Sequence, residues 1–159
     1  MAWHEFGVAL AGAAAALCGL AFVAISLNLQ DILADRTLPG RAAETLLYLG
    51  APLIGALLLL VPGQSDAALG VEVLALTVVL GTLLLRIDLP RLREESELPA
   101  SWRLAHVAPT VVALLLLVLG ALGLITGGFA GVPWLAGAFL LLLVFGLANC
   151  WVLLVEIKR

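Results

Sequence analysis

Apolar residues occur along this chain in five long runs, separated by short polar segments. The runs cover about residues 6–29, 42–61, 67–85, 104–125 and 134–157. A helix that crosses the hydrocarbon core of a bilayer needs about 20 mainly apolar residues, and each run is about that long. The pattern therefore predicts an all-α fold, a polytopic integral membrane bundle of five transmembrane helices.

The segments between the runs are short, with one exception. Residues 37–40 and 62–66 have the composition of tight turns, and residues 126–133 are rich in glycine. The exception is the polar stretch 86–103, which holds two prolines and an acidic run. We expect residues 1–159 to form a single transmembrane domain with 86–103 as a cytoplasmic loop and without a soluble domain.

The positions of the basic residues predict the orientation of the bundle. When the five runs are threaded through a membrane, all eight basic residues fall on one side: Arg36, Arg41, Arg86, Arg91, Arg93, Arg103, Lys158 and Arg159. Basic residues near helix ends are retained on the cytoplasmic side. We therefore expect the N-terminus outside and the C-terminus in the cytoplasm. The preference for Arg over Lys in an Ala/Leu/Gly-rich chain favours a bacterial inner (cytoplasmic) membrane.

Composition excludes several classes of function. The chain is 64% hydrophobic and 12% charged, whereas soluble domains average roughly 45–50% and about 25%. The net charge is −3, so there is no basic surplus to neutralise phosphates, and no nucleic-acid partner is expected. Cys18 and Cys150 both lie inside apolar runs, where a free cysteine behaves as a small hydrophobic residue.

Catalytic motifs are absent from the sequence. It contains no phosphate-binding P-loop, no His-Glu-x-x-His and no Cys-x-x-Cys. The two histidines, His4 and His106, fall on opposite sides of the membrane in the predicted topology and so cannot share a metal. We expect no enzyme activity, no cofactor and no metal site.

The first apolar run carries a series of small residues at intervals of four: Gly7, Ala11, Ala15 and Gly19. Small residues at this spacing let the backbone of a neighbouring helix approach closely in a membrane. We expect this series to be a helix-packing face.

Glu72 is the most informative polar residue because it lies inside an apolar run. An ionisable side chain within a span is costly and by default faces a bundle interior or a water-filled cavity. At 100° per residue, Glu72 shares one face of its helix with Thr82 and Arg86. This face is typical of a polar pathway, although Glu72 could instead lie among lipid headgroups or bond to a neighbouring helix.

Further polar residues gather in the half of the membrane predicted to be cytoplasmic. Asn149 and Glu156 are two helical turns apart on one face, and an interhelical hydrogen bond from Asn149 is an alternative to a pathway role. Glu44 and Tyr48 are four apart and share a face. Together with the end of the first run, these positions could assemble an inner polar cluster of Ser26, Asn28, Glu44, Tyr48, His106, Asn149 and Glu156.

Two functional hypotheses follow. The first is a homo-oligomeric ion channel, or a small-solute or cation transport pathway, lined by the polar faces of 67–85 and 134–157, with Glu72 attracting cations at the outer side. The second is a non-catalytic accessory, regulatory or scaffold subunit of a larger membrane complex, with the loop 86–103 binding a cytoplasmic partner. In the first case the expected partners are the lipid bilayer and further copies of the chain.

Overall fold

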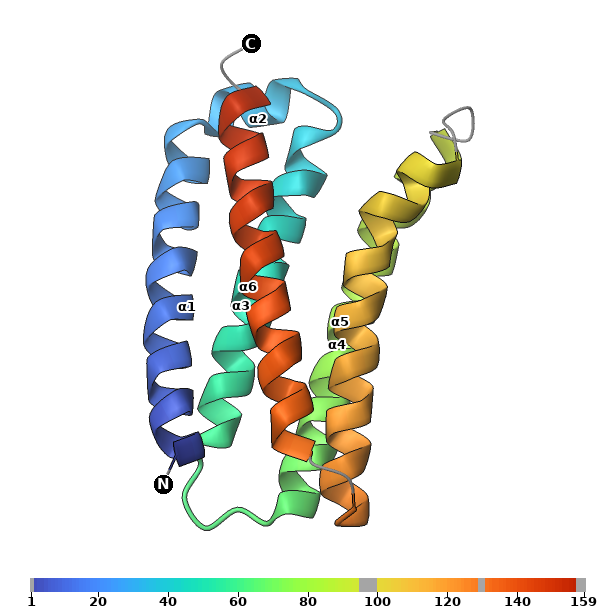
Figure 1. Ribbon diagram of the computed structural model, residues 1–159. Coiled ribbons are helices and arrows are strands. Elements are labelled where there is room, and N and C mark those ends of the chain that lie inside the picture. Colours follow the sequence, from blue (N-terminus) through green and yellow to red (C-terminus); the bar gives the residue numbers. More distant parts are fainter. Residues whose placement is uncertain (1, 95–99, 129–130, 157–159) are drawn as a thin grey trace.

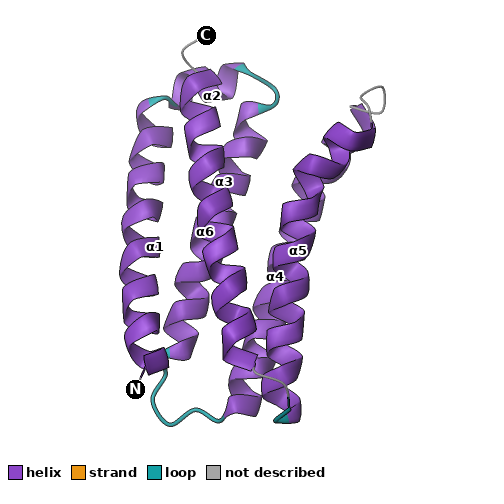
Figure 2. Cartoon of the chain, in the orientation of Figure 1, coloured by secondary structure: helices purple, strands orange, loops and turns teal. Residues whose placement is uncertain are grey.

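The computed structural model describes residues 2–94, 100–128 and 131–156 (Figure 1). Within these ranges the regular elements are all helical (Figure 2). In chain order they are α1 (Ala2–Leu27), α2 (Leu29–Ala34), α3 (Leu38–Leu59), α4 (Asp66–Glu94), α5 (Ala100–Thr126) and α6 (Gly131–Glu156).

Five of the helices are long and apolar enough to cross a membrane. The spans are Trp3–Leu27, Leu38–Leu59, Asp66–Pro90, Val107–Thr126 and Gly131–Val155. Large apolar side chains such as Phe22 and Trp151 lie exposed on the outside of the bundle, at 64% and 71%. Lipid tails can cover such side chains without cost. By helix length and hydropathy, the chain is a multi-pass membrane protein whose surface suits contact with lipid.

The start of α3 differs from the sequence-based expectation. Residues 38–40, predicted to belong to a turn, already form the first turn of the helix. Pro39 is compatible with this position because the first helical N–H groups have no partner within the helix. Just upstream, Oδ1 of Asp35 accepts hydrogen bonds from the backbone N–H groups of Thr37 and Leu38 and from the Thr37 hydroxyl. The turn therefore ends, and α3 begins, four residues earlier than predicted.

The segment 86–103, predicted to be a solvated and partly helical cytoplasmic loop, is helical over residues 86–94 and 100–103. α4 continues through Pro90 to Glu94, and α5 begins at Ala100. Arg, Leu and Glu, which dominate this part of α4, are good helix formers, so the helix does not need an apolar environment to continue. The acidic residues Glu95 and Glu97 lie outside the described residues.

The helix contacts form two groups, one around α3 and one around α5, which share α4 and α6. α3 contacts α1, α4 and α6, while α5 contacts α4 and α6. α6 therefore lies between α3 and α5, and its Phe139 is fully buried in the common core. Figure 1 shows that α4 and α5 lean away from the other helices towards the end that holds α2, which we call the α2 end.

Glycines bring the helices close together at the opposite end, near the connection 60–65, which we call the hairpin end. A Cβ atom at Gly70 of α4 would lie 2.7 Å from the carbonyl oxygen of Ala121 in α5. A Cβ atom at Gly131 of α6 would lie 2.9 Å from the carbonyl oxygen of Gly120 in α5. α4 and α6 thus each lie close to the backbone of α5 at the hairpin end.

Candidate functional site

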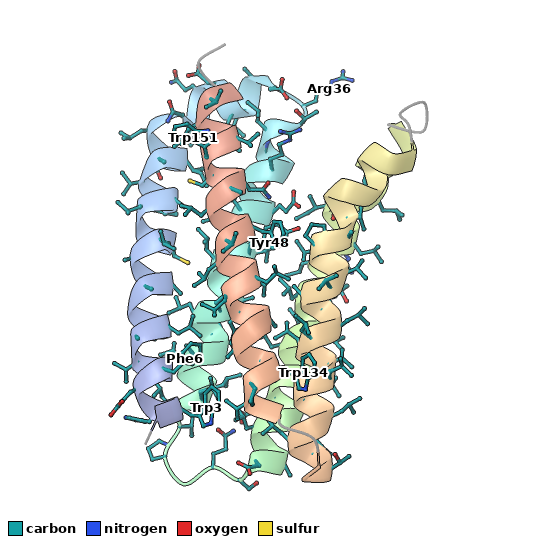
Figure 3. All side chains as sticks on the ribbon, in the orientation of Figure 1. Trp3, Phe6, Arg36, Tyr48, Trp134 and Trp151 are labelled. Atoms are coloured by element: carbon teal, nitrogen blue, oxygen red, sulfur yellow. The ribbon has the colours of Figure 1, made fainter. Side chains whose placement is uncertain are left out.

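A buried polar chain links α3 to α5 within the membrane-spanning part of the bundle. Glu44 and Tyr48 lie on successive turns of α3, and the Tyr48 hydroxyl donates a 2.8 Å hydrogen bond to Oε1 of Glu44. The same hydroxyl shares a hydrogen bond with the hydroxyl of Thr110 in α5. The three residues are 2%, 3% and 8% exposed. Figure 3 shows Tyr48 between α3 and the α4–α5 pair.

Further groups surround this chain. The carboxylate of Asp88 in α4 interacts electrostatically with Tyr48, so a second acid contributes to the site. Arg41 lies one turn before Glu44 on α3 and is half-buried. On the α6 side, Gly146 lies so close that a Cβ atom there would be 3.3 Å from the Cβ atom of Tyr48. Residues of α4, α5 and α6 thus surround the Tyr48 side chain of α3.

The face of α4 that contains Glu72 is turned away from the core. Glu72, Thr82 and Arg86 are all exposed, as are the two residues between them on this face, Ala75 and Val79. The Glu72 carboxylate accepts a hydrogen bond from the side-chain amide of Gln64 in the connection before α4. The Thr82 hydroxyl donates to the carbonyl oxygen of Val78, at 2.7 Å. We call these five residues of α4 the exposed α4 face.

The structure does not bring the polar face of α6 next to the exposed α4 face. Among the described residues, α4 and α6 make no contact, since α3 and α5 lie between them. Asn149 is half-buried on α6. Glu156 is the last residue of that helix, and its side chain is outside those described. The roles predicted for Asn149 and Glu156 remain predictions.

Ser26 and Asn28, near the end of α1, hydrogen bond to their own helix. The Ser26 hydroxyl donates to the carbonyl of Phe22 and the Asn28 amide donates to the carbonyl of Ala24, each at 2.8 Å. Of the predicted inner cluster, Glu44 and Tyr48 are joined directly, while the side chain of His106 lies outside the described ones.

Thr110 belongs to the site but was not predicted from the sequence. A single threonine in an apolar helix gives no signal, and its partner Tyr48 is 62 positions away. The only available hint was that Thr110 falls one turn after His106, which had been placed in the same half of the membrane.

The small residues of α1 divide between two environments. Gly7 is buried, and a Cβ atom placed there would lie 3.2 Å from Cδ2 of Leu60. Ala11 packs against the core. Ala15 and Gly19 are exposed on the surface of the bundle. Because a helix turns 100° per residue, residues four apart are rotated by 40° relative to each other. Four residues in such a series therefore do not all lie on one face of the helix. A role for Ala15 and Gly19 in helix packing would need a further chain.

Comparisons with known proteins do not assign a family. No protein-family model matches the chain, and no curated protein or solved structure is significantly similar to it. The functional argument therefore depends on the residues and their geometry.

Proposed function

We propose that the chain is a subunit of a homo-oligomeric pathway for cations or small polar solutes in the cytoplasmic membrane of a bacterium. The observation that supports this proposal is the exposed α4 face. It carries an acid, a hydroxyl and a base along one span, and all three point away from the core of their own subunit.

The cost of burying polar groups in lipid favours contact between copies. An ionisable residue in a span faces a bundle interior or water rather than lipid. Because α6 is not adjacent to α4 within the described part of one subunit, a pathway cannot be lined by both helices of the same chain. α4 helices from several copies around a central axis would place Glu72, Thr82 and Arg86 on a common water-filled path. Cyclic assemblies of this kind are common among homo-oligomers.

The charge distribution supports an orientation for this pathway. With all eight basic residues on the cytoplasmic side, Glu72 lies near the outer surface and Arg86 near the inner one. A ring of outer carboxylates attracts cations, as acidic rings do in cation channels. In this arrangement Gln64 is a positioning residue that orients the carboxylate through its hydrogen bond.

The test is the oligomeric state followed by flux. Native mass spectrometry from nanodiscs should show a closed ring of three or more copies, and liposomes containing the protein should admit cations. Glu72→Gln should lower the flux roughly five-fold, since one unit charge in contact with a cation contributes about 1 kcal/mol in water. Glu5→Gln is the matched control, because Glu5 is also an exposed acid on the outer side of the bundle. A monomer, or equal flux in both variants, would refute the proposal.

A second candidate function is an accessory subunit that binds a cytoplasmic protein. It is favoured by the charged ends of α4 and α5 (residues 86–94 and 100–103), which are helical and lean away from the other helices (Figure 1). Such a helical hairpin would present a surface outside the membrane. In this case the purified chain conducts nothing, and replacing Glu94, Glu95 and Glu97 with Gln abolishes binding of the partner.

A further inference from the structure

The most unusual group inside the bundle is the carboxyl of Glu44. It is 2% exposed and lies on α3, a helix whose whole length is within a candidate span. A carboxylate is costly in such surroundings unless it is paired or neutralised. Its position therefore requires either compensating partners or a proton.

The hydrogen bonds of Glu44 continue into a chain of two hydroxyls. The Tyr48 hydroxyl hydrogen bonds to both Glu44 and Thr110. A hydroxyl can donate one hydrogen bond and accept others, so the hydrogen bonds among Glu44, Tyr48 and Thr110 can run in two directions. In one direction Thr110 donates to Tyr48 and Tyr48 donates to an ionised Glu44. In the other, a protonated Glu44 donates to Tyr48 and Tyr48 donates to Thr110.

The second arrangement leaves the Thr110 hydroxyl hydrogen in need of an acceptor. Threonines elsewhere in these helices show where it can go. The hydroxyls of Thr45, Thr77, Thr82 and Thr126 each donate to the carbonyl oxygen four residues earlier, at 2.7–2.8 Å. Thr110 has the carbonyl of His106 at the same spacing. Both directions of the chain can therefore be completed without an unsatisfied donor.

We propose that Glu44, Tyr48 and Thr110 form a proton-binding site in the membrane interior. One proton from water joins the Glu44 carboxylate, whose charge changes from −1 to 0, and the two hydroxyls reverse their hydrogen bonds. Release of the proton restores the first arrangement. The site is separate from the exposed α4 face and does not depend on the oligomeric pathway proposed above.

Charged neighbours of both signs lie near the site. The carboxylate of Asp88 interacts electrostatically with Tyr48, whereas Arg41, one turn before Glu44 on α3, carries the opposite charge. Among the described side chains, the helices packed around α3 and α5 also carry Arg86 on α4, Cys18 on α1 and Cys150 on α6.

Infrared spectroscopy tests this proposal on the full chain in lipid nanodiscs. A protonated carboxylic acid has a carbonyl stretching band that an ionised carboxylate lacks, and burial and hydrogen bonding change its frequency. Because the chain has eleven acidic residues, the band of Glu44 is the one that disappears as the pH is raised in the unmodified chain and is missing from the spectra of Glu44→Gln. It should persist in Glu5→Gln, the exposed control.

Tyr48→Phe and Thr110→Val extend the test to the hydroxyls. Tyr48→Phe keeps the ring and removes a hydrogen bond to Glu44, so the band should persist with a clear shift in frequency. Thr110→Val should produce a smaller shift, because Thr110 acts through Tyr48. Titrating bands that are identical in the unmodified chain and in Glu44→Gln would overturn the proposal. An unshifted band in Tyr48→Phe would overturn the hydroxyl chain, and this variant remains informative if Glu44→Gln does not fold.

Discussion

Replacing Gly146 with alanine tests the packing that holds α6 against α3 beside Tyr48. A Cβ atom at Gly146 would lie 2.5 Å from Cδ2 and 2.8 Å from Cγ of Leu49, closer than Cβ atoms are found in proteins. Leu49 is 1% exposed, so its side chain has no free space to turn into. The substitution must push the two helices apart or force Leu49 out of its preferred rotamer.

The magnitude follows from two opposing effects. Overpacking of a filled core costs about 1–3 kcal/mol. Alanine in place of glycine within a helix contributes roughly 0.5–1 kcal/mol of stabilisation. Gly137, also in α6, has no atom within 4 Å of a Cβ atom placed there, so Gly137→Ala retains only the second effect. We expect Gly146→Ala to be less stable than Gly137→Ala by about 1–3 kcal/mol.

The assay is equilibrium unfolding in mixed micelles, with helical circular dichroism followed as SDS is added. Leu49→Ala removes the atoms that obstruct the new Cβ, so the penalty of Gly146→Ala should disappear in that background. The coupling from the double-mutant cycle should fall within about 0.5–3 kcal/mol. Equal stability of the two glycine variants, or a penalty that persists in the Leu49→Ala background, would refute the close contact between α3 and α6.

Two further predictions concern the connections. Hydrogen bonds from the Thr37 hydroxyl, then from the N–H groups of Thr37 and Leu38, hold the pKa of Asp35 below its usual value. The Asp35 carboxylate therefore stabilises the fold fully above the pKa it has in the unfolded chain, and this stabilisation is lost as the pH falls through its lowered pKa in the folded chain. When the pH is lowered, the melting temperature of Asp35→Ala should fall less than that of the unmodified chain. Equal falls in the two proteins would contradict this prediction. Gly63 has a φ of 71°, a left-handed conformation that costs most side chains about 1–2 kcal/mol and asparagine less. Gly63→Ala should therefore lower the stability measured by the same SDS titration by about 1–2 kcal/mol, and Gly63→Asn clearly less. Equal costs in the two variants would contradict a backbone origin.

Hydrophobic length alone was sufficient to predict the five spanning helices, because a lipid environment leaves the backbone few alternatives. Their ends were less predictable. α3 starts at Leu38 because Pro39 suits a first turn and Asp35 satisfies the N–H groups before it. α4 passes Arg86 because the polar residues beyond the apolar run still favour a helix. In both cases the apolar run marks the span, while local backbone chemistry decides where the helix stops.

The candidate site was predictable only within single helices. The pairing of Glu44 with Tyr48 follows from a four-residue spacing, which places both on one face. Their connection to Thr110 depends on which helices are neighbours, and hydropathy carries no information about that. For the same reason the sequence could not show that the polar faces of α4 and α6 belong to separate surfaces, with α3 and α5 between them. The predicted pathway roles of Glu72 and Asn149 await measurement.

The glycine contacts at the hairpin end have a mechanical consequence. α5 approaches α4 and α6 closely there, while the other ends of α4 and α5 lean away from the bundle (Figure 1). Such an arrangement acts as a lever with its fulcrum at Gly120 and Gly131. α5 begins at Ala100, so its arm from Gly120 is about 30 Å long at 1.5 Å per residue. A rotation of about 5° at the fulcrum would displace the far end by roughly 2–3 Å, so a small change of volume among these glycines would be amplified at the opposite end of the bundle.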